Sequence, residues 1–345
     1  MAALFLAGVL AAILGFAAHR ASVCTVRAVA EIMSSGTAYI LLGIGKSVLW
    51  VSAITVPVFL LMPSASTALG GWPLTGAAVL GGLVFGVGAA VNGACAYSTL
   101  ARLADGEGGM LIAAVAFALG ILLFLTLVDS GVIDRPVPAP ALIGMLGWSL
   151  LIAAVLLVPW GIYEIARLWR TRPAGLWAHA LVLAPQYRLS SAAMLIGVAG
   201  AAIFLIYGST SYTVTVQQVV EGLRGARGFP ATERWLLLFA ILAGMLISTL
   251  QRGSFRLDWR PRRIWLRHLF GGLMMGMGVA LTPGGNDALV LYGIPSLSPH
   301  ALPAFVAMLA GIGLGLWSMR VWFGIEMRVA CRHDLYIVGG VTPAR

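Results

Sequence analysis

Charged residues are scarce in this sequence. Only 10% of its 345 residues are charged, whereas 60% are hydrophobic. A soluble globular domain has about 25% charged residues. A chain of this length cannot bury so many apolar side chains in its own core, so much of its surface must face lipid. The composition predicts an integral membrane protein and excludes a soluble enzyme, a nucleic-acid-binding protein and a disordered scaffold.

Lysine and cysteine are also rare. Lys46 is the one lysine among 22 cationic residues, which outnumber 12 acidic residues and give a net charge of +10. Cys24, Cys95 and Cys331 are odd in number and widely spaced, so no disulfide framework is indicated. The sequence has no phosphate-binding GxxxxGK[ST] loop, and its five histidines show no metal-ligand spacing. We therefore expect no ATPase activity, no metal and no other cofactor.

The apolar residues fall into runs that are long enough for helices. These runs lie at about 3–18, 38–61, 74–90, 109–128, 141–158, 190–208, 234–250, 267–281 and 300–322. A helix needs about 20 residues to span a membrane, and several runs are shorter. Three are interrupted, at 19–24, 92–95 and 283–286, and then followed by a second short helical stretch. We predict an all-α polytopic membrane protein, one membrane domain over 1–345, with about nine transmembrane spans that include short broken helices.

Arginine clusters predict the topology, because basic loops face the cytoplasm. One cluster lies in loop 167–188 and the other in loop 252–267, with two apolar runs between them. Loops 62–73 and 129–140 have little net charge, which suits the outer face. If each broken segment crosses once, rather than re-entering, the N-terminus is outside the bacterial inner membrane, and the polar C-terminal tail 323–345 is cytoplasmic. The arginines concerned are Arg167, Arg170, Arg172, Arg188, Arg252, Arg256, Arg260, Arg262, Arg263 and Arg267.

The chain also repeats itself. The segment 81–95 aligns with 271–285 at an offset of 190 residues, and 22–26 aligns with 210–214 at an offset of 188. Five predicted crossings precede residue 190, so the second half would be inverted relative to the first. We predict an inverted internal repeat of about 1–165 and 190–325, which is typical of transporters with broken helices. The alternative is that glycine-rich membrane helices resemble one another by composition alone.

The breaks have a chemical preference. Where a helix breaks inside a membrane, its free N–H groups need partners, and its positive dipole end favours an anion. Gly93, Gly284 and Gly285 let the backbone approach a ligand closely. Cys24 and Cys95 add thiols, which are weak donors with soft sulfur and suit a ligand that presents sulfur. The alternative is that they are small buried hydrophobic residues.

Several charged residues lie near membrane depth. Arg20 and Arg27 flank the first break and could draw an anion toward it. Lys46 lies inside an otherwise apolar run, where we expect Glu31 to neutralise it. The alternative is that these side chains extend outward to the membrane interface. Cys331 lies in the tail, where we expect it to be an incidental thiol.

Two motifs resemble a known family. The segments 15–28, containing His-Arg-Ala-Ser-Val-Cys-Thr, and 86–103, containing Asn-Gly-Ala-Cys-Ala-Tyr-Ser-Thr, are similar to those of the YeeE/YedE sulfur-transport family, which includes bacterial thiosulfate transporters. The resemblance implies short helices that meet near the middle of the membrane, and thiosulfate passed along a row of thiols by S–H···S hydrogen bonds. Cys24 and Cys95 match the first two thiols. The candidate substrate-binding residues are Cys24, Thr25, Arg27, Asn92, Gly93, Cys95, Gly284, Gly285 and Asn286, with Arg20 and Lys46 as accessory charges.

One departure from the family affects the substrate. The third motif of the family reads roughly Pro-Gly-Cys-Asn, whereas residues 283–286 here read Pro-Gly-Gly-Asn. The third thiol is absent, and Cys331 is too distant in sequence to be its simple equivalent. Gly285 could widen the path or offer backbone N–H groups instead. The substrate could then be thiosulfate, sulfite, a polysulfide, a sulfonate or a selenium compound.

The leading hypothesis is therefore a thiosulfate permease or channel, not an enzyme. Its partners would be the sulfur anion and the lipid bilayer. A second hypothesis is a membrane sulfur-relay or sensor protein, in which a thiol accepts sulfane sulfur and passes it to a cytoplasmic sulfurtransferase or regulator. A third is a related carrier of another small anion. Transport leaves the thiols unmodified, whereas a relay leaves a persulfide.

Overall fold

The protein crosses the membrane with helices. The computed structural model describes residues 2–62, 70–140, 147–171, 184–225, 228–260, 263–332 and 334–343. Within these residues, nine helical segments are long and apolar enough to span a bilayer. This confirms the predicted all-α polytopic class and the predicted number of spans. Arg172 and Arg262, which contributed to the predicted topology, lie outside the described residues.

The elements follow one another in a simple order. The helices of the first half are α1 (Ala2–Arg20), α2 (Thr25–Ser35), α3 (Tyr39–Leu61), α5 (Gly76–Asn92), α6 (Ala96–Ala104), α7 (Gly109–Asp129) and α8 (Gly147–Arg170). Those of the second half are α10 (Leu189–Tyr207), α11 (Tyr212–Leu223), α12 (Thr232–Arg252), α13 (Ile264–Leu281), α14 (Asn286–Ala288), the π-helical η2 (Leu289–Gly293) and α15 (Ala301–Phe323). The strands are β1 (Gly70–Gly71), β2 (Ala139–Pro140), β3 (Ile325–Arg332) and β4 (Leu335–Pro343).

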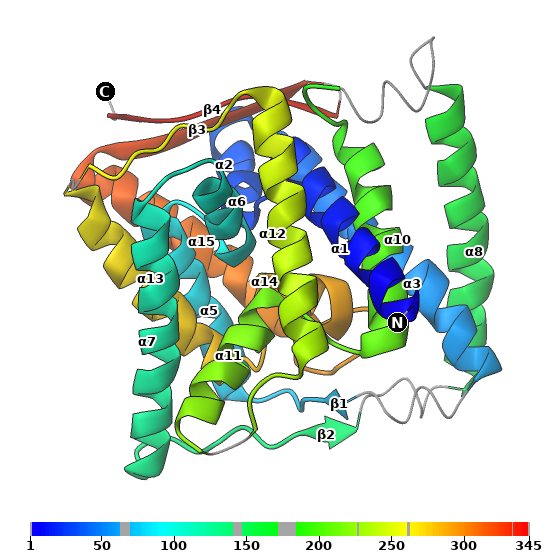
Figure 1. The fold of residues 1–345 in the computed structure, drawn as a ribbon, viewed down its shortest axis with the longest axis horizontal. Helices are drawn as coiled ribbons and strands as arrows, with labels where there is room; N and C mark the ends of the chain where they lie inside the picture. Colours follow the sequence, from blue (N-terminus) through cyan, green and yellow to red (C-terminus); the bar gives the residue numbers. More distant parts are fainter. Residues whose placement is uncertain are drawn as a thin grey trace.

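The two pairs of strands lie at opposite ends of the helical bundle. Figure 1 shows β1 and β2, which pair antiparallel, at one end and the β3–β4 hairpin at the other. The C-terminal end of α12, which begins the second arginine cluster, lies at the β3–β4 end (Figure 1). Arg188 of the first cluster lies there too, since the next residue, Leu189, donates its N–H to the carbonyl of Asp334 in the hairpin turn. Arg188 and the C-terminal end of α12 therefore lie at the same end of the bundle, which agrees with the predicted topology.

The predicted polar tail is partly a β-hairpin. Residues 325–332 pair antiparallel with 335–343 and lie over α2 (Figure 1). The Ser34 hydroxyl of α2 donates to the Val329 carbonyl at 2.9 Å and accepts from the Val329 N–H at 3.1 Å. The alternation of apolar with polar side chains along Ile325–Arg332 is the sequence signal for this strand. The hairpin thus covers one end of the bundle.

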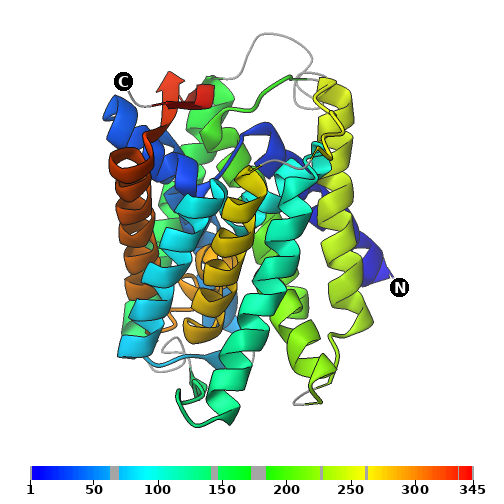
Figure 2. The same ribbon diagram turned by 90° about the vertical axis from the view of Figure 1, so that its left-hand side faces the viewer.

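Glycine allows the central helices to pack closely. Figure 2 shows α15, α5, α13 and α7 side by side in that order. A Cβ atom on Gly88 of α5 would lie 2.8 Å from the carbonyl oxygen of Gly271 on α13, and one on Gly271 would lie 2.7 Å from that of Gly88. Gly81 and Gly278 meet in the same reciprocal way, at 2.8 and 2.6 Å. No larger residue fits at these contacts without moving a helix.

The same packing recurs on both sides of this pair. Gly86 of α5 lies against the carbonyl of Met308 on α15, and Gly276 of α13 lies against that of Phe117 on α7. Gly276 follows Gly86 by 190 residues, the offset of the sequence match. Such recurrence is what an inverted repeat would produce, and the repeat itself stays a prediction.

The first prediction concerns this close packing. A Cβ on Gly15 of α1 would lie 2.1 Å from the carbonyl oxygen of Ile241 on α12, whereas one on Gly8 of the same helix meets nothing within 4 Å. We expect Gly15→Ala to destabilise the protein by about 1–3 kcal/mol. Gly8→Ala is the matched control and should be neutral or stabilising by up to about 1 kcal/mol, because alanine favours helix. Thermal unfolding in detergent measures both; equal stability of the two variants would contradict the packing.

Candidate functional site

Four helices break inside the bundle. Short helices α2, α6, α11 and α14 follow α1, α5, α10 and α13 after breaks of three or four residues. The residues that cap these short helices have extended backbones; they are Cys24, Cys95, Ser211 and Gly285. Three of the breaks were predicted, and the fourth, between α10 and α11, was not. The sequence signal for this fourth break was the match of 22–26 with 210–214. That match aligns Cys24 with Tyr212, whereas in the structure the residue that caps the short helix, as Cys24 does, is Ser211.

The first break is fixed by buried polar side chains. His19 Nδ1 lies 2.8 Å from the Ser248 hydroxyl on α12, and His19 Nε2 lies 3.2 Å from Asp105 Oδ1, just after α6. Arg20, only 1% exposed, donates to the Ser248 hydroxyl at 2.9 Å and to Gln251 Oε1 at 2.6 Å. Burial raises the pKa of Asp105, but hydrogen bonds from His19 and two hydroxyl groups outweigh burial and lower it overall. Arg20 thus holds the break in place and does not line the cavities described below.

The second break is held by Asn92. Its amide donates to the carbonyl of Ala94 at 2.9 Å and to the Thr99 hydroxyl at 3.0 Å, and its Oδ1 lies 2.8 Å from His268 Nδ1 on α13. Gly93 follows with a φ of 76°, a left-handed conformation that few other residues adopt. Asn92 and Gly93 therefore shape the break, and their role in substrate binding stays a prediction.

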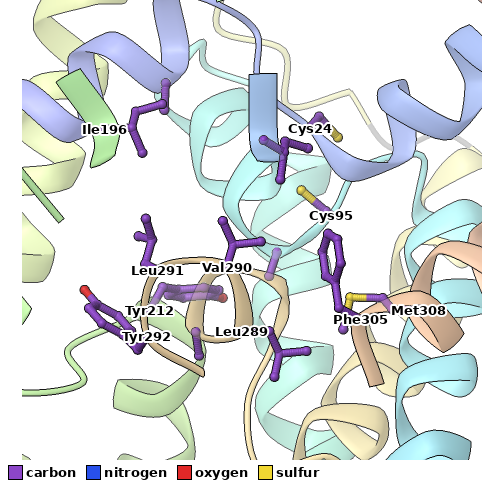
Figure 3. Close-up of a cluster of buried hydrophobic side chains, with 14 of the residues drawn as sticks. Cys24, Cys95, Ile196, Tyr212, Leu289, Val290, Leu291, Tyr292, Phe305 and Met308 are labelled. Carbon is purple, nitrogen blue, oxygen red and sulfur yellow. The ribbon is translucent and has the colours of Figure 1, made fainter. Parts of the chain in front are cut away.

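The two breaks bring Cys24 and Cys95 together. Figure 3 shows the two side chains next to each other, and the two thiols interact. Cys24 is 2% exposed and Cys95 is fully buried. Both sulfurs also lie near backbone N–H groups at the start of the two short helices. Residues 71 positions apart (24 and 95) thus form one buried thiol pair.

A small cavity lies beside the thiol pair. Its volume is about 60 Å³, whereas one water molecule needs about 10–15 Å³ on the same measure. Cys24 lines it, together with apolar side chains that include Ile196 and Leu291 (Figure 3). Three polar lining atoms have no hydrogen-bond partner among the described residues: the Thr25 hydroxyl, the Tyr97 hydroxyl and Asn286 Oδ1. Buried polar groups rarely stay unpaired, so these three atoms are available to form hydrogen bonds with a ligand or water.

Two further cavities continue toward the β1–β2 end. A cavity of about 10 Å³ shares Tyr97 and Asp287 with the one beside the thiols. It also shares Tyr292 with a vestibule of about 430 Å³, which Trp72 lines next to β1. In the vestibule, Arg234 Nη1 has no hydrogen-bond partner within the described part of the chain. The three cavities form a row from one end of the bundle to the thiol pair.

Thr213 fills the space beside Gly285, where the family resemblance implies a thiol. A Cβ atom on Gly285 would lie 2.4 Å from Thr213 Cγ2. The Thr213 hydroxyl accepts from the Gly285 N–H at 3.2 Å and donates to Asp287 Oδ1 at 2.6 Å. The Gly285 N–H is therefore already bonded, and the expectation that it is offered to the anion is wrong. Gly284, with a φ of 146°, turns the chain into α14.

The remaining candidate charges lie apart from the cavity row. The Arg27 guanidinium lies 5.3 Å from the centre of the ring of Tyr336 in the hairpin, and Arg27 does not line any of the three cavities. Lys46 donates to the Ser190 hydroxyl at 2.7 Å and pairs with Glu164 on α8 at 3.1 Å. The expected pairing of Lys46 with Glu31 is wrong, because Glu31 accepts from two backbone N–H groups at the start of α3.

Sequence reasoning did not place Tyr97, Thr213 or Asp287 in the site. Tyr97 belongs to the motif in 86–103, and Asp287 directly follows the interruption at 283–286. Asp287 was the stronger signal, because a carboxylate inside an apolar segment is a candidate functional group by default.

Comparison with known proteins gives one match. The family model described as "Sulphur transport" matches residues 20–314, which include all four breaks. No curated protein matches the chain.

The second prediction tests whether Thr213 occupies the space that a cysteine side chain at position 285 would need. We expect Gly285→Cys to lower thermal stability, because its Cβ would overlap the Thr213 side chain, and overpacking costs about 1–3 kcal/mol. Adding Thr213→Ala removes the nearest atom, Cγ2, and should recover part of that loss. The measurement is the melting temperature in detergent of both single variants and the double variant. Additive losses in the double variant would show that the two positions do not share space.

Proposed function

Because the chain belongs to the sulphur transport family, we propose that this multi-pass membrane protein carries thiosulfate or a closely related small sulfur anion across the bacterial inner membrane. The observation that carries the proposal is the thiol pair of Cys24 and Cys95 at the end of a row of cavities. The unpaired hydroxyls of Thr25 and Tyr97 beside it can donate to an anion.

The anion would enter at the β1–β2 end. Arg234 attracts it into the vestibule, and the anion passes Tyr292 and Tyr97 to reach Cys24. It then passes Cys95 and leaves near Arg27 beneath the hairpin. With this direction, the N-terminus is outside and the arginine clusters and the C-terminus are cytoplasmic, as basic loops favour.

The thiols suit a ligand that presents sulfur. A neutral thiol donates weakly, and its polarisable sulfur makes favourable contacts with another sulfur atom. The N-terminal ends of α2 and α6 add partial positive charge where these thiols lie, each such contact contributing about 0.3–2 kcal/mol. Two thiols therefore contact the anion where the family pattern has three.

A sulfur relay remains the second hypothesis, since adjacent thiols could exchange a sulfur atom. Cys331 is a poor third member of such a relay. It lies on β3 beside Glu31, and burial together with that carboxylate raises the pKa of Cys331 to about 12. Its thiol is thus neutral at physiological pH, whereas the thiolate is the reactive form. In either hypothesis, a cytoplasmic sulfurtransferase could use the sulfur that this protein delivers.

The third prediction separates these hypotheses. In cells that lack other thiosulfate importers, we expect Cys24→Ala and Cys95→Ala to lose thiosulfate uptake, because each removes a thiol from the path. Cys331→Ala is the matched control and should retain uptake. Labelled thiosulfate measures uptake, and immunoblotting of membranes confirms equal expression.

Intact mass spectrometry completes this test. Transport leaves the wild-type mass unchanged, whereas a relay adds the mass of a sulfur atom to Cys24 or Cys95. Wild-type protein that gives no uptake above background would contradict thiosulfate transport.

The fourth prediction concerns Tyr97. We expect Tyr97→Phe to raise the half-saturation concentration for thiosulfate about tenfold or more, because a hydrogen bond to a charged group contributes about 1.5–3 kcal/mol. Tyr163→Phe on α8 is the control, since that side chain is 66% exposed and lies outside the cavities. Uptake kinetics at varied thiosulfate concentration measure the effect, and equal values for the two variants would remove Tyr97 from the site.

A further inference from the structure

Asp287 lies at the narrowest part of the cavity row. Its side chain lines both the cavity of about 10 Å³ and the cavity of about 60 Å³ beside Cys24. The residue is 6% exposed and belongs to α14, the short helix after the break that follows α13. An anion that moves from the vestibule to the thiols must therefore pass this carboxyl group.

Within the part of the chain that the structure describes, the Asp287 carboxyl group has hydrogen bonds but no ion pair. Asp287 Oδ1 accepts from the Thr213 hydroxyl at 2.6 Å, and Oδ2 accepts from the Thr213 N–H at 3.3 Å. Among the described residues, no cationic side chain pairs with it. A buried carboxylate is normally paired with a cation, so its place in an anion path requires an explanation.

The other titratable groups around Asp287 leave it without a compensating charge. Tyr97 faces it from α6, Tyr212 from α11 and Tyr292 from η2, all as neutral phenols at physiological pH. Cys24 lies across the shared cavity at the start of α2. Arg234 on α12 faces Tyr292, which stands between the vestibule and Asp287.

Electrostatics then decide when an anion can pass. An ionised carboxylate in a poorly hydrated passage repels a dianion strongly, because the low local dielectric does not screen them. A proton on Asp287 removes this repulsion and turns the group into a hydrogen-bond donor. The Thr213 hydroxyl can serve both forms, since a hydroxyl donates to the carboxylate and accepts from the protonated acid.

We propose that Asp287 is the proton-binding group of a proton-coupled anion transport cycle. Asp287 takes up a proton from the outer side as the anion enters and releases it to the cytoplasm after the anion has left, so one proton crosses with each anion and none is consumed. For a dianion such as thiosulfate, the net charge moved is one negative charge. This inference rests on the proposed transport function.

The test uses the full-length protein in liposomes. The membrane potential is held at zero with equal potassium and valinomycin, an inward proton gradient is imposed, and thiosulfate uptake and luminal pH are followed together. For the wild-type protein, we expect the gradient to accelerate uptake and added thiosulfate to acidify the lumen. For Asp287→Asn, we expect loss of that acidification, and the ratio of uptake with and without the gradient should fall to one.

Two controls keep the result specific. Asp134→Asn removes an exposed carboxylate at the β1–β2 end and should behave as wild type. Thr213→Val removes the donor to the ionised form but keeps Asp287, so coupling should persist with its pH midpoint moved upward. Thr213→Val also gives an independent test of the site if Asp287→Asn does not fold.

The outcomes are distinguishable. Thiosulfate that enters without acidifying the lumen overturns the coupling and leaves transport intact. A wild-type response in Asp287→Asn, or an unshifted midpoint in folded Thr213→Val, overturns the assignment to Asp287. No thiosulfate entry under any condition overturns the proposed transport itself.

Discussion

The structure depends on the requirement that every backbone polar group inside a membrane has a partner. Lipid offers none, so a helix can break at membrane depth only where the protein supplies them. Here the breaks lie in the interior of the protein, and side chains such as Asn92 and Thr213 form hydrogen bonds with backbone groups that the breaks leave unpaired. The same breaks free the starts of short helices, which is why two capping cysteines lie together beside a cavity that Cys24 lines.

Close helix packing is what makes this interior rigid enough to hold a site. The reciprocal contact of Gly88 with Gly271 brings two broken segments together at backbone distance. In lipid, association of helices relies on such packing, because burying apolar surface gains little there. A shift of α5 against α13 would move Cys95 relative to Asp287, since each follows one of these helices. These glycines therefore help to position the site, although they do not contact a substrate.

Much of this architecture is predictable from sequence, because periodic and compositional signals report it. Apolar runs indicate the spans, and Gly- and Cys-bearing interruptions indicate three of the breaks. The features that the sequence did not predict depend on contacts between distant segments. The pairing of Lys46 with Glu164 joins α3 to α8, and Thr213 fills the space beside Gly285 from 72 residues away. No local pattern specifies either contact. The alternation of apolar and polar residues along β3, by contrast, was a local signal for a strand, but the polar composition of the tail led us to predict no structure there.

The replacement at Gly285 links the thiols to the acid. With a glycine at that position, Thr213 can approach the α14 backbone, and its hydroxyl then reaches Asp287. A cysteine there would occupy the space of the threonine and leave the carboxyl group without its hydroxyl partner. The lack of a side chain at position 285 and the hydrogen bonding of a buried acid thus belong to one packing arrangement. A path with two thiols and a hydroxyl-bonded carboxyl group would contact the sulfur of the anion at one end and admit the anion at the other when the carboxyl group is protonated.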